Sequence, residues 1–251
     1  MQGRLFGPRE DPERYEVKEA IGRGAAAAVY RCVVVATGEV QAVKVIDLRS
    51  LRLHPHAQRE EQRILREISI LRALRHRRVV SLRDAIRTES EIFVVTELVE
   101  GGELFAEVAD RGALQEHDAR EVFRQLLDGL EYCHSVGVIH RDLKPENILV
   151  EKTRSGERSV KISDFGLSKM VEGVAGSQAK TMLGTPQYWA PEVIEAARSG
   201  RRYDRRVDLW SLGVTLYVVL AGKYPFGGGA TPMEEQIRAG SLSFGGRRWR
   251  G

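Results

Sequence analysis

Two short strings of the sequence, HRDLKPEN and DFG, carry polar residues that could act on a phosphoryl group. The first runs from His140 to Asn147, and the second begins at Asp164. Transfer of a phosphoryl group from a nucleotide requires metal ions that bridge the phosphates and a group that positions the attacking hydroxyl. Asn147 and Asp164 provide oxygen ligands for metal. Asp142 adds a separate carboxylate, and Lys144 adds a nearby positive charge. Any one of these residues could merely cap a loop, but the complete pair of strings favours catalysis.

The elements that must position these residues differ between the two ends of the chain. Residues 15–46 and the later runs VVSLRDAI and EIFVVTELV are rich in Val and Ile, which predicts β-strands. Residues 57–75 and 118–136 carry apolar side chains at helical spacing, and residues 207–221 predict a strongly apolar helix. The layout therefore predicts a small sheet-rich unit up to about Val99 and a helical unit after it, with a ligand cleft between them.

The composition excludes several classes of protein. The chain has 251 residues, of which 42% are hydrophobic and 29% charged, as in ordinary soluble globular proteins. The longest apolar stretch, residues 214–221, is far too short to span a bilayer, and the first residues lack the apolar core of a signal peptide. Cys32 and Cys133 give neither a disulfide framework nor metal-ligand spacing. We therefore expect an intracellular protein of the cytoplasm or nucleus, with no membrane partner.

The net charge of +4 is concentrated in one segment. Residues 49–78 hold nine arginines against three glutamates, so the rest of the chain is close to neutral. This distribution argues against a general polyanion-binding surface, and we expect no nucleic-acid partner. We interpret the segment as a solvated basic face, and a basic nucleic-acid module is the weaker alternative.

Taken with these motifs, the sequence resembles the eukaryotic protein-kinase family over roughly residues 15–244. The resemblance implies an α+β, bilobal protein-kinase-like fold with a small β-rich N-lobe and a larger, mainly helical C-lobe. The expected organisation is a flexible arm over residues 1–13, a kinase domain over 14–244 with its lobes at 14–99 and 100–244, and an unmatched tail over 245–251. Because the family continues with further helices, we expect an incomplete C-lobe and a Glu192 without its usual arginine partner. An incomplete gene sequence and a genuine short isoform would both explain such an end.

The resemblance implies a transferase that uses ATP and Mg²⁺ to phosphorylate protein substrates on Ser or Thr. In this role Asp142, Lys144 and Asn147 are catalytic, and Asn147 and Asp164 hold metal. The residues that it places around the nucleotide are Ile21, Gly22, Gly24, Val29, Ala42, Lys44, Glu67, Thr96, Glu97, Val99, Glu103, Glu146, Leu149 and Asp164.

The implied phosphate-binding residues lie in the first unit. The string GRGAAAAV resembles the family's glycine loop, except that Ala27 replaces the third glycine and lacks its free access to positive φ, which predicts weaker phosphate clamping. Lys44 resembles the lysine that holds the α- and β-phosphates. Glu67 fits best as its ion-pair partner, and Glu60 and Glu61 are alternatives.

The implied adenine pocket takes residues from several segments of the chain. Thr96 resembles the residue that lines the back of the pocket, and the backbone of Glu97 and Val99 would hydrogen-bond adenine. The apolar residues expected to enclose adenine are Val29, Ala42 and Leu149.

Several residues are expected to bind the protein substrate. Lys144 and the string GTPQYWAPE imply Ser or Thr acceptors. Glu103 and Glu146 could face a substrate arginine upstream of the acceptor. Thr185 is expected to bond Asp142 and Lys144 and to shape the acceptor pocket.

Regulation is expected to act through the activation segment. Thr181 is the best candidate for phosphorylation, by an activating kinase or by autophosphorylation, and Ser177 is the second. A phosphate there would pair with Arg141 and order the segment. Asp208 is expected to anchor the catalytic loop from the apolar helix.

The resemblance can be carried to a narrower group. The strings GGELF, REISIL and DGLEYCH look like the calcium/calmodulin-dependent kinase group, and TMLGTPQYWAPE looks most like its checkpoint-kinase branch. The main rival to an active enzyme is a truncated nucleotide-binding pseudokinase or scaffold. Since every catalytic motif residue is present, this rival depends on missing structure and not on missing chemistry.

Overall fold

The computed structural model describes residues 1–8, 14–23, 27–152, 158–170, 183–245 and 249. Two compact units make up the chain. The first comprises residues 1–75 and 80–99, and the second comprises residues 76–79 and 100–251. Within the described ranges, no helix combines the length and the apolar composition that crossing a bilayer requires.

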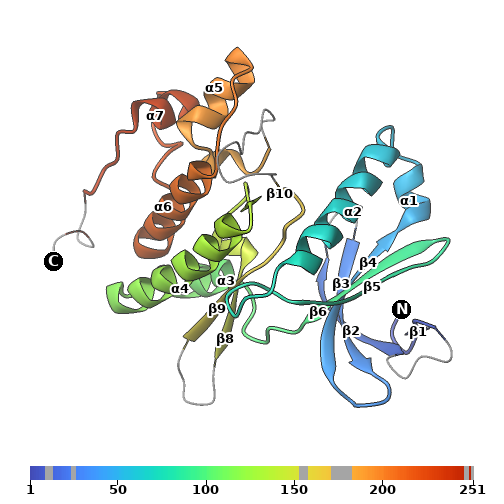
Figure 1. The fold of residues 1–251 in the computed structure, drawn as a ribbon. Helices are drawn as coiled ribbons and strands as arrows, with labels where there is room; N and C mark the ends of the chain where they lie inside the picture. The colour runs from blue at the N-terminus through green and yellow to red at the C-terminus, as the bar shows by residue number, and fades with distance from the viewer. Residues whose placement is uncertain (9–13, 24–26, 153–157, 171–182, 246–248, 250–251) are drawn as a thin grey trace. The chain divides into compact units, whose positions relative to one another are not determined.

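A six-stranded antiparallel sheet forms the first unit, with the strand order β1-β2-β3-β4-β6-β5 (Figure 1). Val43 and Val45 lie opposite Val95 and Phe93 of the neighbouring strand, and all four side chains are buried in one core cluster. Because side chains alternate along a strand, this register directs Lys44 to the opposite face of the sheet. The strands are β1 (Leu5–Phe6), β2 (Tyr15–Arg23), β3 (Ala27–Val34), β4 (Val40–Asp47), β5 (Leu82–Arg87) and β6 (Glu91–Glu97).

Two helices follow β4 in this unit, α1 (Leu48–Arg52) and α2 (Ala57–Ala73). Asp47 caps α1, because its Oδ1 accepts the backbone N–H of Arg49 at 2.8 Å. Helix α2 buries one stripe and leaves the other residues exposed or half-buried, as the helical spacing predicted. The buried stripe consists of Glu67, Ile68, Ile70 and Leu71. The exposed arginines of α2 are Arg59, Arg63, Arg66 and Arg72.

The start of the chain corrects one expectation. Residues 1–13 were expected to form a flexible arm, but Leu5–Phe6 pairs with β2 as strand β1. The buried ring of Phe6 stacks on Tyr15 and Phe93, with ring centroids 5.1 and 4.4 Å away. Arg4 forms a bidentate ion pair with the buried Glu91. A strand of two residues is too short to show a period in the sequence, so its partners could not be predicted. Residues 9–13 lie outside the described part.

The second unit is mainly helical, with two small two-stranded sheets, β7 with β10 and β8 with β9. Helix α4 packs against β9 and against α6 (Figure 1). The helices of the second unit are α3 (Leu104–Arg111), α4 (Glu116–Ser135), α5 (Pro191–Ser199), α6 (Arg206–Ala221) and α7 (Met233–Ala239), with short 3₁₀ turns at Pro145–Asn147 and Pro186–Tyr188. Its strands are β7 (Val138–Ile139), β8 (Ile148–Lys152), β9 (Arg158–Ile162) and β10 (Lys169–Met170). The sheet-rich first unit and the helical second unit confirm the predicted α+β class.

Helix α6 is buried over most of its surface because apolar residues occur all around it. It also contains Asp208, whose side chain has no exposed surface. A charged group in such a place must be fully hydrogen-bonded to be tolerated. The partners of Asp208 lie at the site described next.

Candidate active site

The loop that carries the HRDLKPEN string is held from α6 by Asp208. One carboxylate oxygen of Asp208 accepts the backbone N–H of His140 at 2.9 Å, and the other accepts the N–H of Arg141 at 2.7 Å. Arg141 has a φ of 69°, a left-handed conformation that costs free energy in a residue other than glycine. The expected anchoring role of Asp208 is therefore confirmed by two backbone hydrogen bonds.

Sequence reasoning missed a third partner of this carboxylate. His134 of α4 is that partner, and its Nε2 lies 2.8 Å from Asp208 Oδ2. The adjacent Cys133 does behave as a core residue, since burial raises the pKa of its thiol to about 12. Only the unusual presence of a polar residue in a buried helix face could have indicated the contact of His134.

The ring of His140 has a defined tautomer. Its Nδ1 accepts the backbone N–H of Asp142 at 3.3 Å, so its Nε2 carries the proton and donates to the carbonyl of Ser163 at 3.0 Å. The ring also meets Phe165 edge to face, with centroids 4.9 Å apart. These contacts join the HRDLKPEN loop to the DFG segment.

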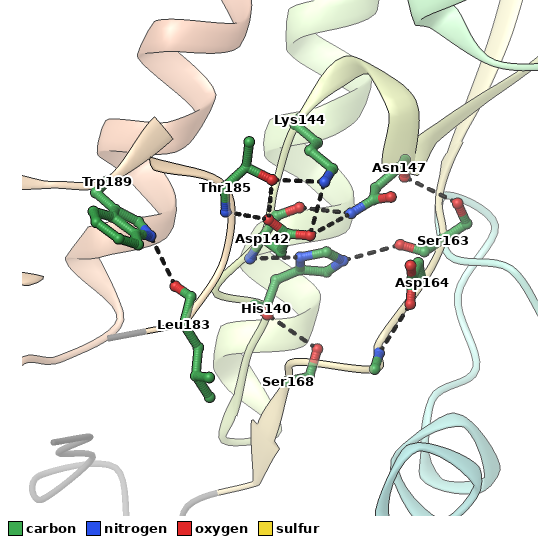
Figure 2. A network of polar contacts seen from close by, with 11 residues as sticks. His140, Asp142, Lys144, Asn147, Ser163, Asp164, Ser168, Leu183, Thr185 and Trp189 are labelled. Carbon is green, nitrogen blue, oxygen red and sulfur yellow. Dashed lines mark hydrogen bonds and ion pairs between the residues drawn. The ribbon is translucent and has the colours of Figure 1, made fainter. Parts of the chain in front are cut away.

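Asp142 is the centre of the polar network in Figure 2, and its side chain accepts three hydrogen bonds and forms one ion pair. Its Oδ1 accepts the N–H and the hydroxyl of Thr185, at 2.9 and 3.0 Å. Its Oδ2 accepts from Asn147 Nδ2 at 3.2 Å and lies 3.1 Å from Lys144 Nζ. Lys144 Nζ also donates to the Thr185 hydroxyl at 2.7 Å. The contacts of Thr185 are those expected from the sequence.

Asn147 and Asp164 offer the ligand chemistry that Mg²⁺ requires. Asn147 directs its amide nitrogen at the carbonyl and carboxylate of Asp142, at 2.8 and 3.2 Å, so its amide oxygen faces away from that carboxylate. That oxygen accepts no hydrogen bond from the described residues. Asp164 is held in a left-handed conformation, φ 56°, and its Oδ1 accepts the Gly166 N–H at 3.1 Å.

These two ligands fit the way in which proteins hold Mg²⁺. The described residues contain no cluster of three or more acidic, His or Cys side chains for a metal. Mg²⁺ bound to a nucleotide needs no such cage, because one or two protein oxygens and the phosphates complete its coordination. One amide oxygen and one carboxylate therefore fit a metal ion that arrives with a nucleotide.

In the first unit, Lys44 of β4 forms the expected ion pair. Its Nζ lies 3.0 Å from Oε1 of Glu67, which is buried on α2. The two alternatives have other partners: Glu60 pairs with Arg63 at 3.4 Å, and Glu61 pairs with an arginine of β5. Burial within the apolar stripe distinguishes Glu67 from its neighbours.

Some of the residues expected around the nucleotide lie opposite one another on neighbouring strands of the first unit's sheet. Gly22 lies opposite Val29, and Ala42 lies opposite Thr96. Ile21 is exposed, and Ala42 and Val99 are buried. Gly24 lies outside the described residues.

The expected contact of adenine with Glu97 is restricted by the fold. The backbone N–H of Glu97 already donates to the Ser81 carbonyl at 3.1 Å, so that N–H is not available to a base.

In the second unit, Leu149 of β8 forms an isolated bridge with Glu103.

Two carboxylates of the second unit, those of Glu103 and Glu146, lie close enough for the charge of Glu146 to act on Glu103. Burial raises the pKa of Glu103, and the negative charge of Glu146 raises it further, while Lys144 acts in the opposite direction. Oε2 of Glu146 is buried without a hydrogen-bond partner among the described residues. A cation placed beside these carboxylates would therefore relieve an unfavourable arrangement.

The remaining expectations concern the phosphosites, Arg141 and Glu192. Thr181 and Ser177 lie outside the described residues. The side chain of Arg141 donates to the carbonyls of Leu167 and Ser168, at 2.7 and 3.5 Å, and its pairing with a phosphate stays a prediction. Glu192, expected to lack its usual arginine partner, is exposed, so water solvates it and the cost of burying an unpaired carboxylate does not arise.

Comparison with known proteins identifies the family. The model of the protein kinase domain matches residues 15–244. The chain belongs to the protein kinase family. The predicted protein-kinase-like fold is thereby confirmed, and use of ATP and Mg²⁺ is general in this family.

Curated relatives that this kinase resembles are named as protein kinases, two of the three below as serine/threonine-protein kinases. CBL-interacting protein kinase 24 of Oryza sativa is 41% identical over 96% of this chain and 51% of its own length. The probable serine/threonine-protein kinase fhkC of Dictyostelium discoideum is 38% identical over 97% of this chain and 39% of its own. CBL-interacting serine/threonine-protein kinase 5 of Arabidopsis thaliana is 43% identical over 88% and 46%. The chain spans about half the length of these relatives or less.

Proposed function

We propose that this kinase transfers the γ-phosphate of ATP to Ser and Thr hydroxyls of protein substrates. The observation that carries the proposal is the network around Asp142, which joins a carboxylate, a lysine and a candidate metal ligand within hydrogen-bond distance. In phosphoryl transfer most of the catalysis comes from positioning and electrostatics, and this network provides both.

Asp142 would accept or orient the proton of the substrate hydroxyl. Its carboxylate is fully engaged, so an incoming hydroxyl must replace one of the present donors. Lys144 is the donor best able to move away from Asp142, because its long side chain is flexible. Its Nζ also bonds the Thr185 hydroxyl and would keep that partner. Lys144 would then lie beside the transferred phosphoryl group, where its charge stabilises the developing negative charge.

Asn147 and Asp164 would hold Mg²⁺, which neutralises phosphate charge when it is bound with ATP. Lys44, kept in place by Glu67, would bind the α- and β-phosphates. The residues proposed for the rest of the nucleotide site keep their roles from the family resemblance. They are Ile21, Gly22, Gly24, Val29, Ala42, Thr96, Glu97, Val99 and Leu149.

A preference for basic residues upstream of the acceptor is part of the proposal. It is supported by the raised pKa of Glu103 and by the unpartnered carboxylate oxygen of Glu146. A guanidinium would supply up to five donors to these oxygens and would replace their mutual repulsion with attraction.

We also propose control through the activation segment, by an activating kinase or by autophosphorylation at Thr181. The motif argument from the sequence is its support. Membership of the calcium/calmodulin-dependent kinase group, likeness to the checkpoint-kinase branch and an intracellular location remain predictions of the same kind. Protein partners beyond substrates belong here as well, since two of the relatives are named as CBL-interacting kinases.

The test compares the wild-type chain with Asp142→Asn, using ATP, Mg²⁺ and an Arg-x-x-Ser peptide. We expect the variant to bind ATP normally and to lose transfer by about a hundredfold or more, the usual contribution of a positioned base. A folded wild-type chain that binds ATP without transferring phosphate would instead favour the non-catalytic, scaffolding alternative.

A further inference from the structure

Trp189 lies in the short link between the 3₁₀ turn Pro186–Tyr188 and α5. The motif analysis used this residue only as one letter of GTPQYWAPE. Its indole ring packs against two separate core clusters of the second unit. One cluster contains Ile139 and Val207, and the other contains Ile194 and Val218. A large ring packed between two cores is a rigid base from which its polar N–H can act.

The indole N–H of Trp189 is directed at Leu183, which precedes Trp189 in the activation segment. Its Nε1 donates to the carbonyl of Leu183 at 3.0 Å (Figure 2). Leu183 is followed by Gly184, which has a φ of 99°, a conformation that favours glycine. A Cβ on Gly184 would lie 2.6 Å from the Arg141 carbonyl and 3.5 Å from Trp189 Nε1. Residues 183–185 are therefore confined between the indole and the catalytic loop.

The next residue, Thr185, connects this confined segment to Asp142. Its N–H and hydroxyl both bond Asp142 Oδ1, at 2.9 and 3.0 Å. The contacts thus run from the core to Trp189, to the Leu183 carbonyl, and through Thr185 to the carboxylate. The catalytic loop is held separately by Asp208 of α6, which accepts the Arg141 N–H.

We propose that Trp189 is a positioning residue, whose indole N–H fixes residues 183–185 against the catalytic loop and thereby sets the orientation of the Asp142 carboxylate. The proposal rests on the proposed kinase function. Tryptophan combines the apolar ring that the two clusters require with a donor that Leu, Ile or Phe lacks at this position. Trp189 touches neither substrate nor phosphate in this role, and its effect passes through Thr185.

The test uses Trp189→Phe, with Trp210→Phe as the matched control. Trp210 packs against the same two clusters, but its Nε1 is buried without a hydrogen-bond partner among the described residues. Both substitutions shorten a core aromatic ring, and only the first removes a hydrogen bond to the activation segment. The first readout is hydrogen exchange at the Thr185 amide, which needs no enzymatic activity.

For Trp189→Phe we expect this exchange to accelerate about two- to tenfold, the equivalent of one hydrogen bond. We expect kcat for an Arg-x-x-Ser peptide to fall by a similar factor, with KM for ATP unchanged. Trp210→Phe should alter neither quantity. In combination with Thr185→Val, the kcat effect of Trp189→Phe should shrink, because both act on the same contact.

Equal exchange and equal kcat in the two single variants would overturn the proposal. So would a loss of thermal stability in Trp189→Phe without faster exchange at Thr185, since that result describes a core residue only. If the wild-type chain transfers no phosphate, the proposed function fails, while the exchange experiment still decides whether Trp189 fixes the segment.

Discussion

The substitution Asp208→Asn should destabilise this kinase far more than an ordinary change of charge. The carboxylate accepts three N–H groups, from the backbone of His140 and Arg141 and from His134, at 2.9, 2.7 and 2.8 Å. An amide has one oxygen, and its NH₂ group cannot accept, so at least one donor loses its partner. Hydrogen bonds to a charged group contribute about 1.5–3 kcal/mol each, and full burial prevents water from replacing the lost bond. The left-handed Arg141 would also lose the contact that holds its strained backbone.

We therefore expect the free energy of unfolding to fall by about 2–4 kcal/mol in Asp208→Asn. The assay is urea unfolding of the full chain, followed by fluorescence and circular dichroism. Glu116→Gln is the control, because Glu116 is exposed on α4 and pairs with Arg120 at 2.7 Å. Exposed pairs of this type contribute about 0.3–0.5 kcal/mol. A loss in Asp208→Asn no larger than that of the control would refute the argument that this carboxylate holds the loop.

Three further perturbations test other parts of the account. Thr185→Val removes the hydroxyl that joins Lys144 to the Asp142 carboxylate, so steady-state kinetics should show kcat lower by about tenfold to a hundredfold, with KM for ATP unchanged; a change under about twofold would count against this bridge. Because burial and the charge of Glu146 raise the pKa of Glu103 above its ordinary value, its carboxylate is protonated at a higher pH than that of an ordinary Glu, and preference for an arginine peptide should fade as pH decreases toward that pKa. Removal of the neighbouring charge in Glu146→Gln should move this loss to lower pH, and calorimetric titrations showing the same pH profile for both proteins would contradict the coupling. Arg4→Met leaves the buried Glu91 carboxylate without its ion-pair partner; since Arg4 itself is 41% exposed, we expect a loss of only about 1–2 kcal/mol in urea unfolding, and unchanged stability would show that β1 does not depend on this pair.

The parts of the site that could be predicted from the sequence are those whose residues are close together in the chain. Asp142, Lys144 and Asn147 belong to one short string, so their spacing alone brings them together. Glu67 could be selected as the partner of Lys44 because it belongs to an apolar helical stripe, and its burial on α2 explains the selection.

Contacts between distant segments could not be predicted in the same way. Phe6 stacks on Phe93, although neither the residues next to Phe6 in the sequence nor a hydrophobic period indicates that Phe93 is its partner. His134 lies on an amphipathic helix whose pattern identifies buried positions but not the carboxylate that meets them. The indole N–H of Trp189 has a partner only because the chain turns back at Gly184. In each case tertiary packing, and not local propensity, determines the contact.

The most direct test of the central claim measures transfer of the labelled γ-phosphate of ATP to peptides that differ only in the acceptor. The wild-type chain is incubated with ATP, Mg²⁺ and Arg-x-x-Ser, Arg-x-x-Thr or Arg-x-x-Tyr peptides, beside Asp142→Asn. We predict label on the Ser and Thr peptides, little on the Tyr peptide, and a loss of about a hundredfold or more in Asp142→Asn. Equal labelling by Asp142→Asn, or labelling of the Tyr peptide alone, would contradict the account.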